Sequence, residues 1–293
     1  MEEQTINLTE TILNSINEIF SQMFSSIDNN IYTILDDIVF INPDMLSSST
    51  FKNLFGSPTD SGILLICNSL VLGFIIYYAT NYLISHLTYS RIDTPKQFIF
   101  KSIIFIAIMN SSLWVCEQII NIISLINISI SDVCNNLFHN NISFSNFIDS
   151  INKTIYISNT TFNVFSFDGL IKSFTSFGLI SLVFTYSLRY IMVQIFVLIS
   201  PFAFLSLITN SSEWFFRIWL KSFISLLLIQ ILISLILLLS FTIDINQNTT
   251  ISKLLFIGII YALIRANIYI KELFGGISTT VNANLSDFAG KKL

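Results

Sequence analysis

Apolar residues of this chain are gathered into long runs that charged residues seldom interrupt. A helix needs about 20 apolar residues to cross a bilayer. Five runs approach or exceed that length, and with boundaries good to a few residues they cover 62–86, 102–126, 174–200, 223–243 and 254–270. No Asp, Glu, Lys or Arg lies between Asp60 and Arg91 or between Lys221 and Asp244. We therefore predict an all-α integral membrane protein with about five transmembrane helices.

The first 24 residues follow a different pattern, in which apolar positions recur at helical spacing between polar ones. The polar positions include the acids Glu10 and Glu18 and no Lys or Arg. Helices that lie on a membrane surface usually carry basic residues on the polar face. The pattern therefore predicts an amphipathic helix that packs against the protein's own spans or against a partner.

Composition supports the membrane assignment and narrows the function. Hydrophobic residues make up 53% of the chain and charged residues 11%, whereas typical soluble domains carry roughly 25% charged residues. The net charge of −4 excludes a broadly basic nucleic-acid-binding protein. Three cysteines cannot form a complete disulfide framework.

The basic residues of the connections predict the orientation, because short cytoplasmic loops are enriched in Lys and Arg. Segment 87–101 carries three bases, and Arg217 and Lys221 lie between the third and fourth spans. In the first 60 residues Lys52 is the one base against nine acids. We predict an outside N-terminus and a cytoplasmic C-terminus. The expected organisation is an extracellular amphipathic helical region at 1–60, two spans in 61–126, an extracellular loop at 127–173, three spans in 174–273 and a cytoplasmic tail at 274–293.

Two charged residues lie deep within the predicted spans, where charge is costly and tends to mark a pathway or a buried pair. Counted from the outer face at about 1.5 Å per residue, Glu117 lies roughly 14–20 Å deep and Arg189 roughly 18–22 Å deep. The two therefore share one layer, and an ion pair is geometrically allowed. They form either the lining of a polar conduit or a buried pair that fixes helix packing. Arg265 lies close to Lys271, so we expect it to reach the inner headgroups.

The third span runs on beyond the thickness of a bilayer. The apolar run 177–208 would measure about 48 Å as a helix, against a hydrocarbon core of about 30 Å. Pro201 removes a backbone donor within this run and clashes with the preceding turn. It predicts an elbow of the helix near the inner face.

Other polar and aromatic residues are expected to anchor or connect the spans. Trp214, Trp219 and Lys221 lie at the predicted cytoplasmic start of the fourth span, which is typical of interfacial anchors. Gln194 and Gln230 on successive spans are candidates for a hydrogen bond between helices.

Sequence motifs of enzymes are missing from the chain. The two histidines, His86 and His139, lie far apart on opposite predicted sides, and no zinc-binding spacing or glycine-rich phosphate loop occurs. We expect no catalytic residue, no metal and no cofactor. Energy for any transport must then come from a partner or from an ion gradient.

Two stretches, about a third of the chain, carry a family resemblance. They are RIDTPKQFIFKSIIFIAIMNSSLW at 91–114 and, within 187–241, SLRYIMVQIFVLISPFAFLSL followed by WFFRIWLKSFISLLLIQILISLILLLSF. The chain resembles the TrbL-like polytopic inner-membrane subunit of type IV secretion (conjugal transfer) systems in its short Gram-positive form. The matching positions are Arg189, Pro201, Trp219, Lys221 and Gln230. The scarcity of glycine departs from the close packing expected of channel helices.

The resemblance implies an all-helical, multi-pass protein of the bacterial cell membrane, grouped around a translocation path. It implies work with a secretion ATPase and other secretion subunits, and self-association as a homo-oligomer. Contact with DNA or nucleoprotein rests on the resemblance alone, and the family has no catalytic residues. Our hypothesis is a non-enzymatic channel or scaffold subunit for conjugative DNA transfer. The alternatives are a secondary transporter or permease, in which Glu117 and Arg189 bind a solute, and a membrane subunit of another envelope secretion machine.

Overall fold

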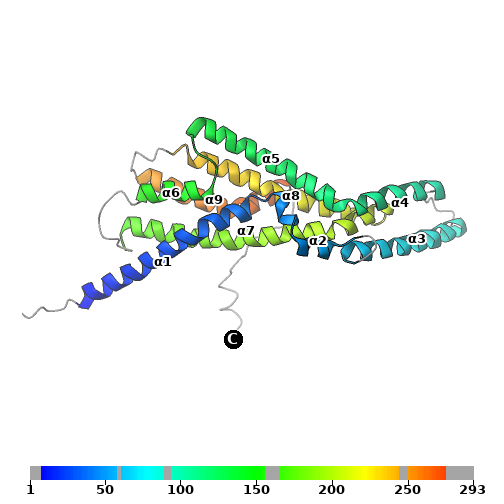
Figure 1. Ribbon diagram of the computed structural model, residues 1–293, viewed down its shortest axis with the longest axis horizontal. Coiled ribbons are helices and arrows are strands. Elements are labelled where there is room, and N and C mark those ends of the chain that lie inside the picture. The colour runs from blue at the N-terminus through cyan, green and yellow to red at the C-terminus, as the bar shows by residue number, and fades with distance from the viewer. Residues whose placement is uncertain (1–7, 58–60, 89–93, 156–164, 244–249, 275–293) are drawn as a thin grey trace, which may run out of the picture.

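Helices form all the regular structure in the residues that the computed structural model describes, which are 8–57, 61–88, 94–155, 165–243 and 250–274 (Figure 1). The α-helices are α1 (Leu8–Val39), α2 (Ser49–Phe55), α3 (Ile63–Thr88), α4 (Pro95–Asn110), α5 (Ser112–Phe138), α6 (Phe144–Ile155), α7 (Phe167–Leu205), α8 (Glu213–Ser240) and α9 (Thr250–Phe274). Two short 3-10 helices, Pro43–Leu46 and Ser206–Ile208, follow α1 and α7.

Five of these segments are long and apolar enough to cross a membrane. They are Ile63–Leu87, Ser112–Phe138, Phe167–Ile208, Glu213–Ser240 and Thr250–Phe274. The all-α character and the five candidate spans of the sequence analysis are thereby confirmed. Which end of each span faces the cytoplasm stays a prediction.

The second span lies farther along the chain than the hydropathy pattern predicts. The apolar run is divided at Ser111, whose backbone leaves the helical region (φ −97°, ψ 10°), so that α4 is a separate helix of 16 residues. Thr94 and Gln97 form a capping box at the start of α4. The span itself is α5, at Ser112–Phe138 instead of 102–126.

The centre of the molecule is the pair α7 and α8, here called the central pair. More than half of each apolar span is buried, 56% for α7 and 61% for α8, against 11% for α3 and 17% for α5. α1, α5 and α9 pack along the central pair, whereas α3 and α4 form a hairpin that extends to one end of the molecule (Figure 1). Few residues of α3 and α5 are therefore buried within the chain.

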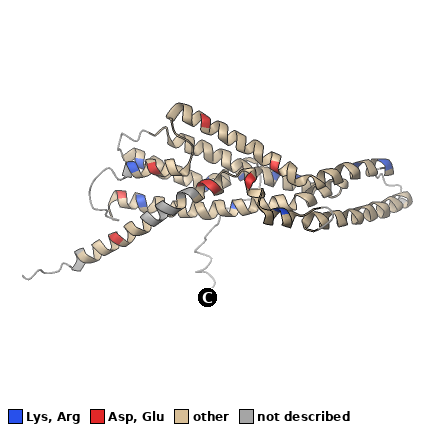
Figure 2. Cartoon of the chain, viewed as in Figure 1, with Lys and Arg blue, Asp and Glu red and all other residues tan. Residues whose placement is uncertain are grey.

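The two basic connections lie at the same end of the central pair. Lys101 Nζ of α4 donates a hydrogen bond to Asn210 Oδ1 in the turn between α7 and α8, at 3.2 Å. At the opposite end, Lys253 Nζ of α9 lies 2.6 Å from Asp168 Oδ1 of α7. Figure 2 shows how few charged residues interrupt the helices between these ends. Lys101 and the turn between α7 and α8 therefore share one end of the central pair, and the side of the membrane that this end faces stays a prediction.

Candidate functional site

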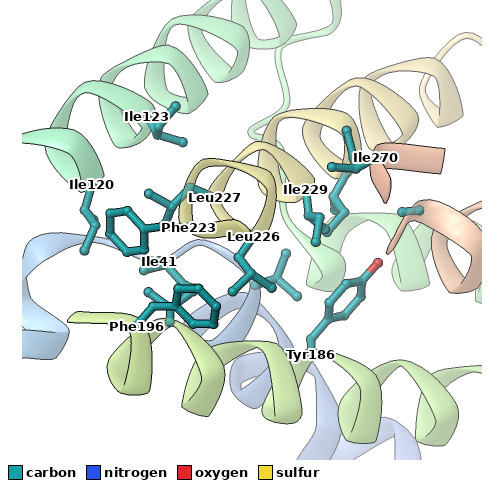
Figure 3. Packing of buried hydrophobic residues seen from close by; sticks show 14 of the residues in the cluster. Ile41, Ile120, Ile123, Tyr186, Phe196, Phe223, Leu226, Leu227, Ile229 and Ile270 are labelled. Carbon is teal, nitrogen blue, oxygen red and sulfur yellow. The ribbon is translucent and has the colours of Figure 1, made fainter. Parts of the chain in front are cut away.

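α1 ends inside the bundle. Val39 and Ile41 are 0% and 1% exposed, and the chain leaves the helical conformation at residues 39–42, here called the α1 tip. Figure 3 shows Ile41 among Phe196 of α7, Phe223 of α8 and Ile120 of α5. A helix end leaves backbone groups without helical partners, and in apolar surroundings each such group must be satisfied by the protein.

Two polar side chains of the central pair supply these partners. Arg189 Nη2 of α7 donates a hydrogen bond to the Val39 carbonyl oxygen at 2.5 Å. Gln230 Oε1 of α8 accepts a hydrogen bond from the Ile41 N–H at 2.9 Å. The positive guanidinium also lies at the C-terminus of a helix, where the helix dipole favours a cation. Arg189 and Gln230 therefore clamp the α1 tip.

The guanidinium of Arg189 has an aromatic neighbour. Among the described residues no carboxylate forms an ion pair with this guanidinium. Its Cζ lies 5.7 Å from the ring centroid of Tyr186, whose hydroxyl donates to the Leu263 carbonyl oxygen of α9 at 2.7 Å. Arg189 and Gln230 are both 0% exposed. Arg189 Nε, Arg189 Nη1 and Gln230 Nε2 have no hydrogen-bond partner in the part of the chain that the structure describes. The clamp therefore contains three buried donor atoms for which this part of the chain supplies no acceptor.

These unpartnered donors oppose the apolar burial of the same region. A buried polar group without a partner costs roughly 1–3 kcal/mol, and more when it is charged. Burying one large apolar side chain contributes roughly 1.5–3 kcal/mol. Leu35, Val39, Ile41 and Leu46 are all buried around the α1 tip. The unpartnered donors therefore weaken the hold that apolar packing and the two hydrogen bonds have on the α1 tip.

A polar cavity of about 280 Å³ lies beside the α1 tip. Five polar side chains from the chain after α1, from α5 and from α8 line it: Asn42, Ser124, Asn127, Ser131 and Ser234. Ser234 Oγ lies 3.0 Å from Asn127 Oδ1 and 2.9 Å from the Gln230 carbonyl oxygen. The described lining includes Phe40 and Ile41 of the α1 tip, no charged side chain and no residue of α7.

The structure does not bring Glu117 to Arg189. Among the described residues no ion pair or hydrogen bond joins them, and Glu117 is half-buried. Cys116, the neighbour of Glu117, contacts Ser200, which lies eleven residues and so roughly 16 Å farther along α7 than Arg189. The displaced second span explains the difference, because the depth of Glu117 was counted from an outer end at residue 126 and the helix runs to Phe138.

Pro201 lies inside α7, which continues for four residues to Leu205 before the 3-10 helix and the turn into α8. Pro201 has no N–H to donate to the Val197 carbonyl oxygen, one helical turn earlier. Ser200 Oγ donates to that oxygen instead, at 2.7 Å. The helix therefore ends near the predicted elbow, but a few residues after the proline.

Trp219 differs from its predicted role as an interfacial anchor. It is 2% exposed, donates from Nε1 to the Phe196 carbonyl oxygen at 2.9 Å, and stacks on Phe223 with ring centroids 5.4 Å apart. Its position on α8 faces α7, so it joins the two helices of the central pair. Trp214 and Lys221 are exposed, as interfacial anchors must be.

The structure does not bring Gln194 to Gln230 either. Within the described residues no hydrogen bond joins them, since Gln230 accepts from Ile41. Gln194 follows Arg189 by five residues, which turns it about 140° around α7 from the clamp. Arg265 is exposed, as expected, and its guanidinium lies 5.4 Å from the ring centroid of Tyr261.

Two polar contacts of α6 were not predicted. Asp36 Oδ1 of α1 accepts a hydrogen bond from the Phe144 N–H at the start of α6, at 2.7 Å. Burial raises the pKa of Asp36, and the backbone hydrogen bonds from Phe144 and Ser145 partly oppose this. Lys172 of α7 is fully buried and donates to Asn152 Oδ1 of α6 at 2.8 Å. The helical pattern of α6, which lies in the predicted extracellular loop, is the signal that could have located these contacts.

No group of three or more His, Cys, Asp or Glu residues that could hold a metal occurs in the described part of the chain. Comparisons with protein-family models, with curated proteins and with solved structures find no match to this chain. The family resemblance of the two stretches therefore stays a hypothesis, and the site is argued from its own geometry.

Proposed function

We propose that this chain is a non-catalytic channel or scaffold subunit of a bacterial type IV secretion apparatus for conjugative DNA transfer. The observation that carries the proposal is where the five matching residues of the resemblance lie in the structure. Four of the five, Arg189, Pro201, Trp219 and Gln230, are buried in the central pair. They clamp the α1 tip, accommodate the helix end or join α7 to α8, which is what a framework requires.

Two exposed apolar helices also support a role in an assembly. α3 and α5 bury little of their apolar length within the chain. Such surfaces are covered in a membrane by lipid or by helices of other subunits. We propose that α3 and α5 receive neighbouring subunits, copies of the chain included.

The basic end of the central pair is the proposed contact for a secretion ATPase. Lys96 and Lys101 of α4 and Arg217 and Lys221 of α8 lie on elements that meet at this end. The charge rule places it in the cytoplasm, where an ATPase would dock. DNA enters the proposal through the resemblance alone.

Deleting the gene in its native host tests this proposal. We expect the frequency of DNA transfer to fall to background and to return when the parent chain is supplied in trans. A Lys221→Met variant, altered at an exposed position of the basic end, should assemble normally and restore transfer less well than the parent. Undiminished transfer in the deletion strain contradicts the proposal.

The polar cavity favours a second candidate, a transporter of a small polar solute. A cavity lined by amides and hydroxyls beside a helix end within the bundle is similar to the substrate sites that transporters form at the ends of half-helices. The described lining contains neither Glu117 nor Arg189, so the solute would meet Asn42, Asn127 and Ser234. Solute uptake by reconstituted vesicles that Asn127→Ala abolishes, together with normal DNA transfer in the deletion strain, would favour this candidate.

A further inference from the structure

The α1 tip separates two polar regions of the bundle. On one side lies the cavity, lined by α5, α8, Ile142 and three residues of the α1 tip itself, Phe40, Ile41 and Asn42. On the other side the tip is bonded to Arg189 of α7, and no described residue of α7 lines the cavity. Ile41 takes part in both, because it lines the cavity and donates its N–H to Gln230.

The donors behind the α1 tip are closed off from solvent. Arg189 Nε, Arg189 Nη1 and Gln230 Nε2 are buried, and within the described residues they have no acceptor. A buried guanidinium with nitrogen atoms that lack an acceptor is unfavourable, and hydrogen bonds to water or to an anion would lower its free energy. Ile41 lines the cavity and is bonded to Gln230, so withdrawal of the α1 tip would open a route from the polar cavity for either of them.

We propose that the α1 tip is a gate, and that its withdrawal admits water and small anions from the cavity to Arg189. The clamp closes the gate through two hydrogen bonds, from Arg189 to Val39 and from Ile41 to Gln230. Apolar contacts of Val39 and Ile41 with the central pair add to them. The open arrangement gains partners for the three donors. The ligand class follows from those donors, since a cationic guanidinium and an amide N–H select an anion.

Cysteine accessibility measures the gate in the full-length chain. Val193 is fully buried on α7, one turn beyond Arg189, and Val193→Cys serves as the reporter in a chain whose Cys67, Cys116 and Cys134 are replaced by alanine. The protein is reconstituted in nanodiscs and treated with two methanethiosulfonates of similar size. One reagent carries a sulfonate and the other a quaternary ammonium group.

Gln230→Leu removes the acceptor that holds Ile41. We expect it to raise the labelling rate of the reporter thiol at position 193 roughly five- to tenfold, which is the effect of one hydrogen bond on an equilibrium. When each rate is divided by that reagent's rate with a free thiol in solution, the anionic reagent should be favoured over the cationic one. Arg189→Met should abolish this preference for the anion, and Arg189→Lys should retain it.

Asn267→Leu provides the matched control. It also replaces a buried amide, on α9, and should leave the labelling rate unchanged. Equal acceleration by Gln230→Leu and Asn267→Leu would mean general loosening and would overturn the gate. So would an unchanged rate in a Gln230→Leu protein that elutes and melts like a folded one.

A cross-link gives an independent test that does not need the clamp variants to fold. Cysteines introduced by Asn42→Cys and Asn127→Cys, at two positions that line the same cavity, are joined before labelling with a short bis(methanethiosulfonate), which forms a disulfide to each cysteine and releases methanesulfinate. Joining them should lower the basal labelling of the reporter thiol, and an unaltered basal rate overturns the proposal. None of these measurements depends on DNA transfer, so the gate and the secretion role fail or succeed separately.

Discussion

Ser200 and Pro201 should show strong energetic coupling, because one side chain replaces the hydrogen bond that the other removes. Ser200 Oγ donates to the Val197 carbonyl oxygen at 2.7 Å, and Ser200 and Pro201 are both buried. In Ser200→Ala that oxygen loses its donor. The expected cost is about 1–3 kcal/mol of unfolding free energy, the penalty of a buried polar group without a partner.

In a protein that already carries Pro201→Ala, Ser200→Ala no longer leaves the Val197 carbonyl oxygen without a donor. The substituted alanine has an N–H that can donate to the Val197 carbonyl oxygen in the regular helical pattern. Ser200→Ala should then cost about 0.5 kcal/mol or less, within the usual range for a replaceable hydrogen bond. The contact between Ser200 and Cys116 is lost in both backgrounds and cancels in the comparison.

A double-mutant cycle measures the coupling. Unfolding of the four proteins is followed in mixed micelles by circular dichroism as denaturant increases. Thr175→Val is the matched control, since it removes a buried hydroxyl of α7 that bonds to the Ile171 carbonyl oxygen, where the helix already supplies a backbone donor. Equal costs of Ser200→Ala in the two backgrounds would refute the reasoning.

Two further predictions concern contacts of α1 and α9. Burial raises the pKa of Asp36 above its ordinary value of 3.8, so the folded chain holds that proton more tightly and loses stability as pH rises through the raised value. Asp36→Asn keeps an acceptor for the Phe144 N–H and should be more stable than the parent at pH values above the raised pKa of Asp36. Thermal melts across a pH series should show this difference vanish at lower pH. A difference that does not depend on pH contradicts the prediction. An added Cβ at Gly178 would lie 2.6 Å from Ile260 Cγ2, so Gly178→Ala should cost about 1–3 kcal/mol in denaturant unfolding. Gly73→Ala meets no atom within 4 Å and should stabilise α3 by about 0.5–1 kcal/mol; equal effects at the two glycines would show that α7 and α9 do not approach closely there.

Local pattern was enough to count the spans, although the second span lies about ten residues farther along the chain than predicted. Runs of apolar residues reveal helices long enough for a membrane wherever they lie in the bundle, so five spans could be predicted without knowledge of their contacts. Polar residues inside the apolar runs also indicated the candidate site, because two of them, Arg189 and Gln230, form the clamp on the α1 tip. What they contact could not be read from the pattern.

Which residues contact each other could not be predicted, because the hydropathy pattern does not encode helix breaks or long-range packing. The break at Ser111 moved the second span along the chain and carried Glu117 away from Arg189. The clamp joins residues separated by 150 and 189 positions, and no local period encodes such distances. One local signal was present, since Asn42 followed by Pro43 is typical of a turn and marks the end of α1.

Cross-linking in the native host tests the central claim most directly. A tagged full-length chain is cross-linked in cells and purified, and the bound proteins are identified by mass spectrometry. We expect recovery of a secretion ATPase together with other envelope subunits of the secretion apparatus. Recovery of the chain alone, or only with copies of itself, would contradict the account and turn attention to solute uptake through the polar cavity.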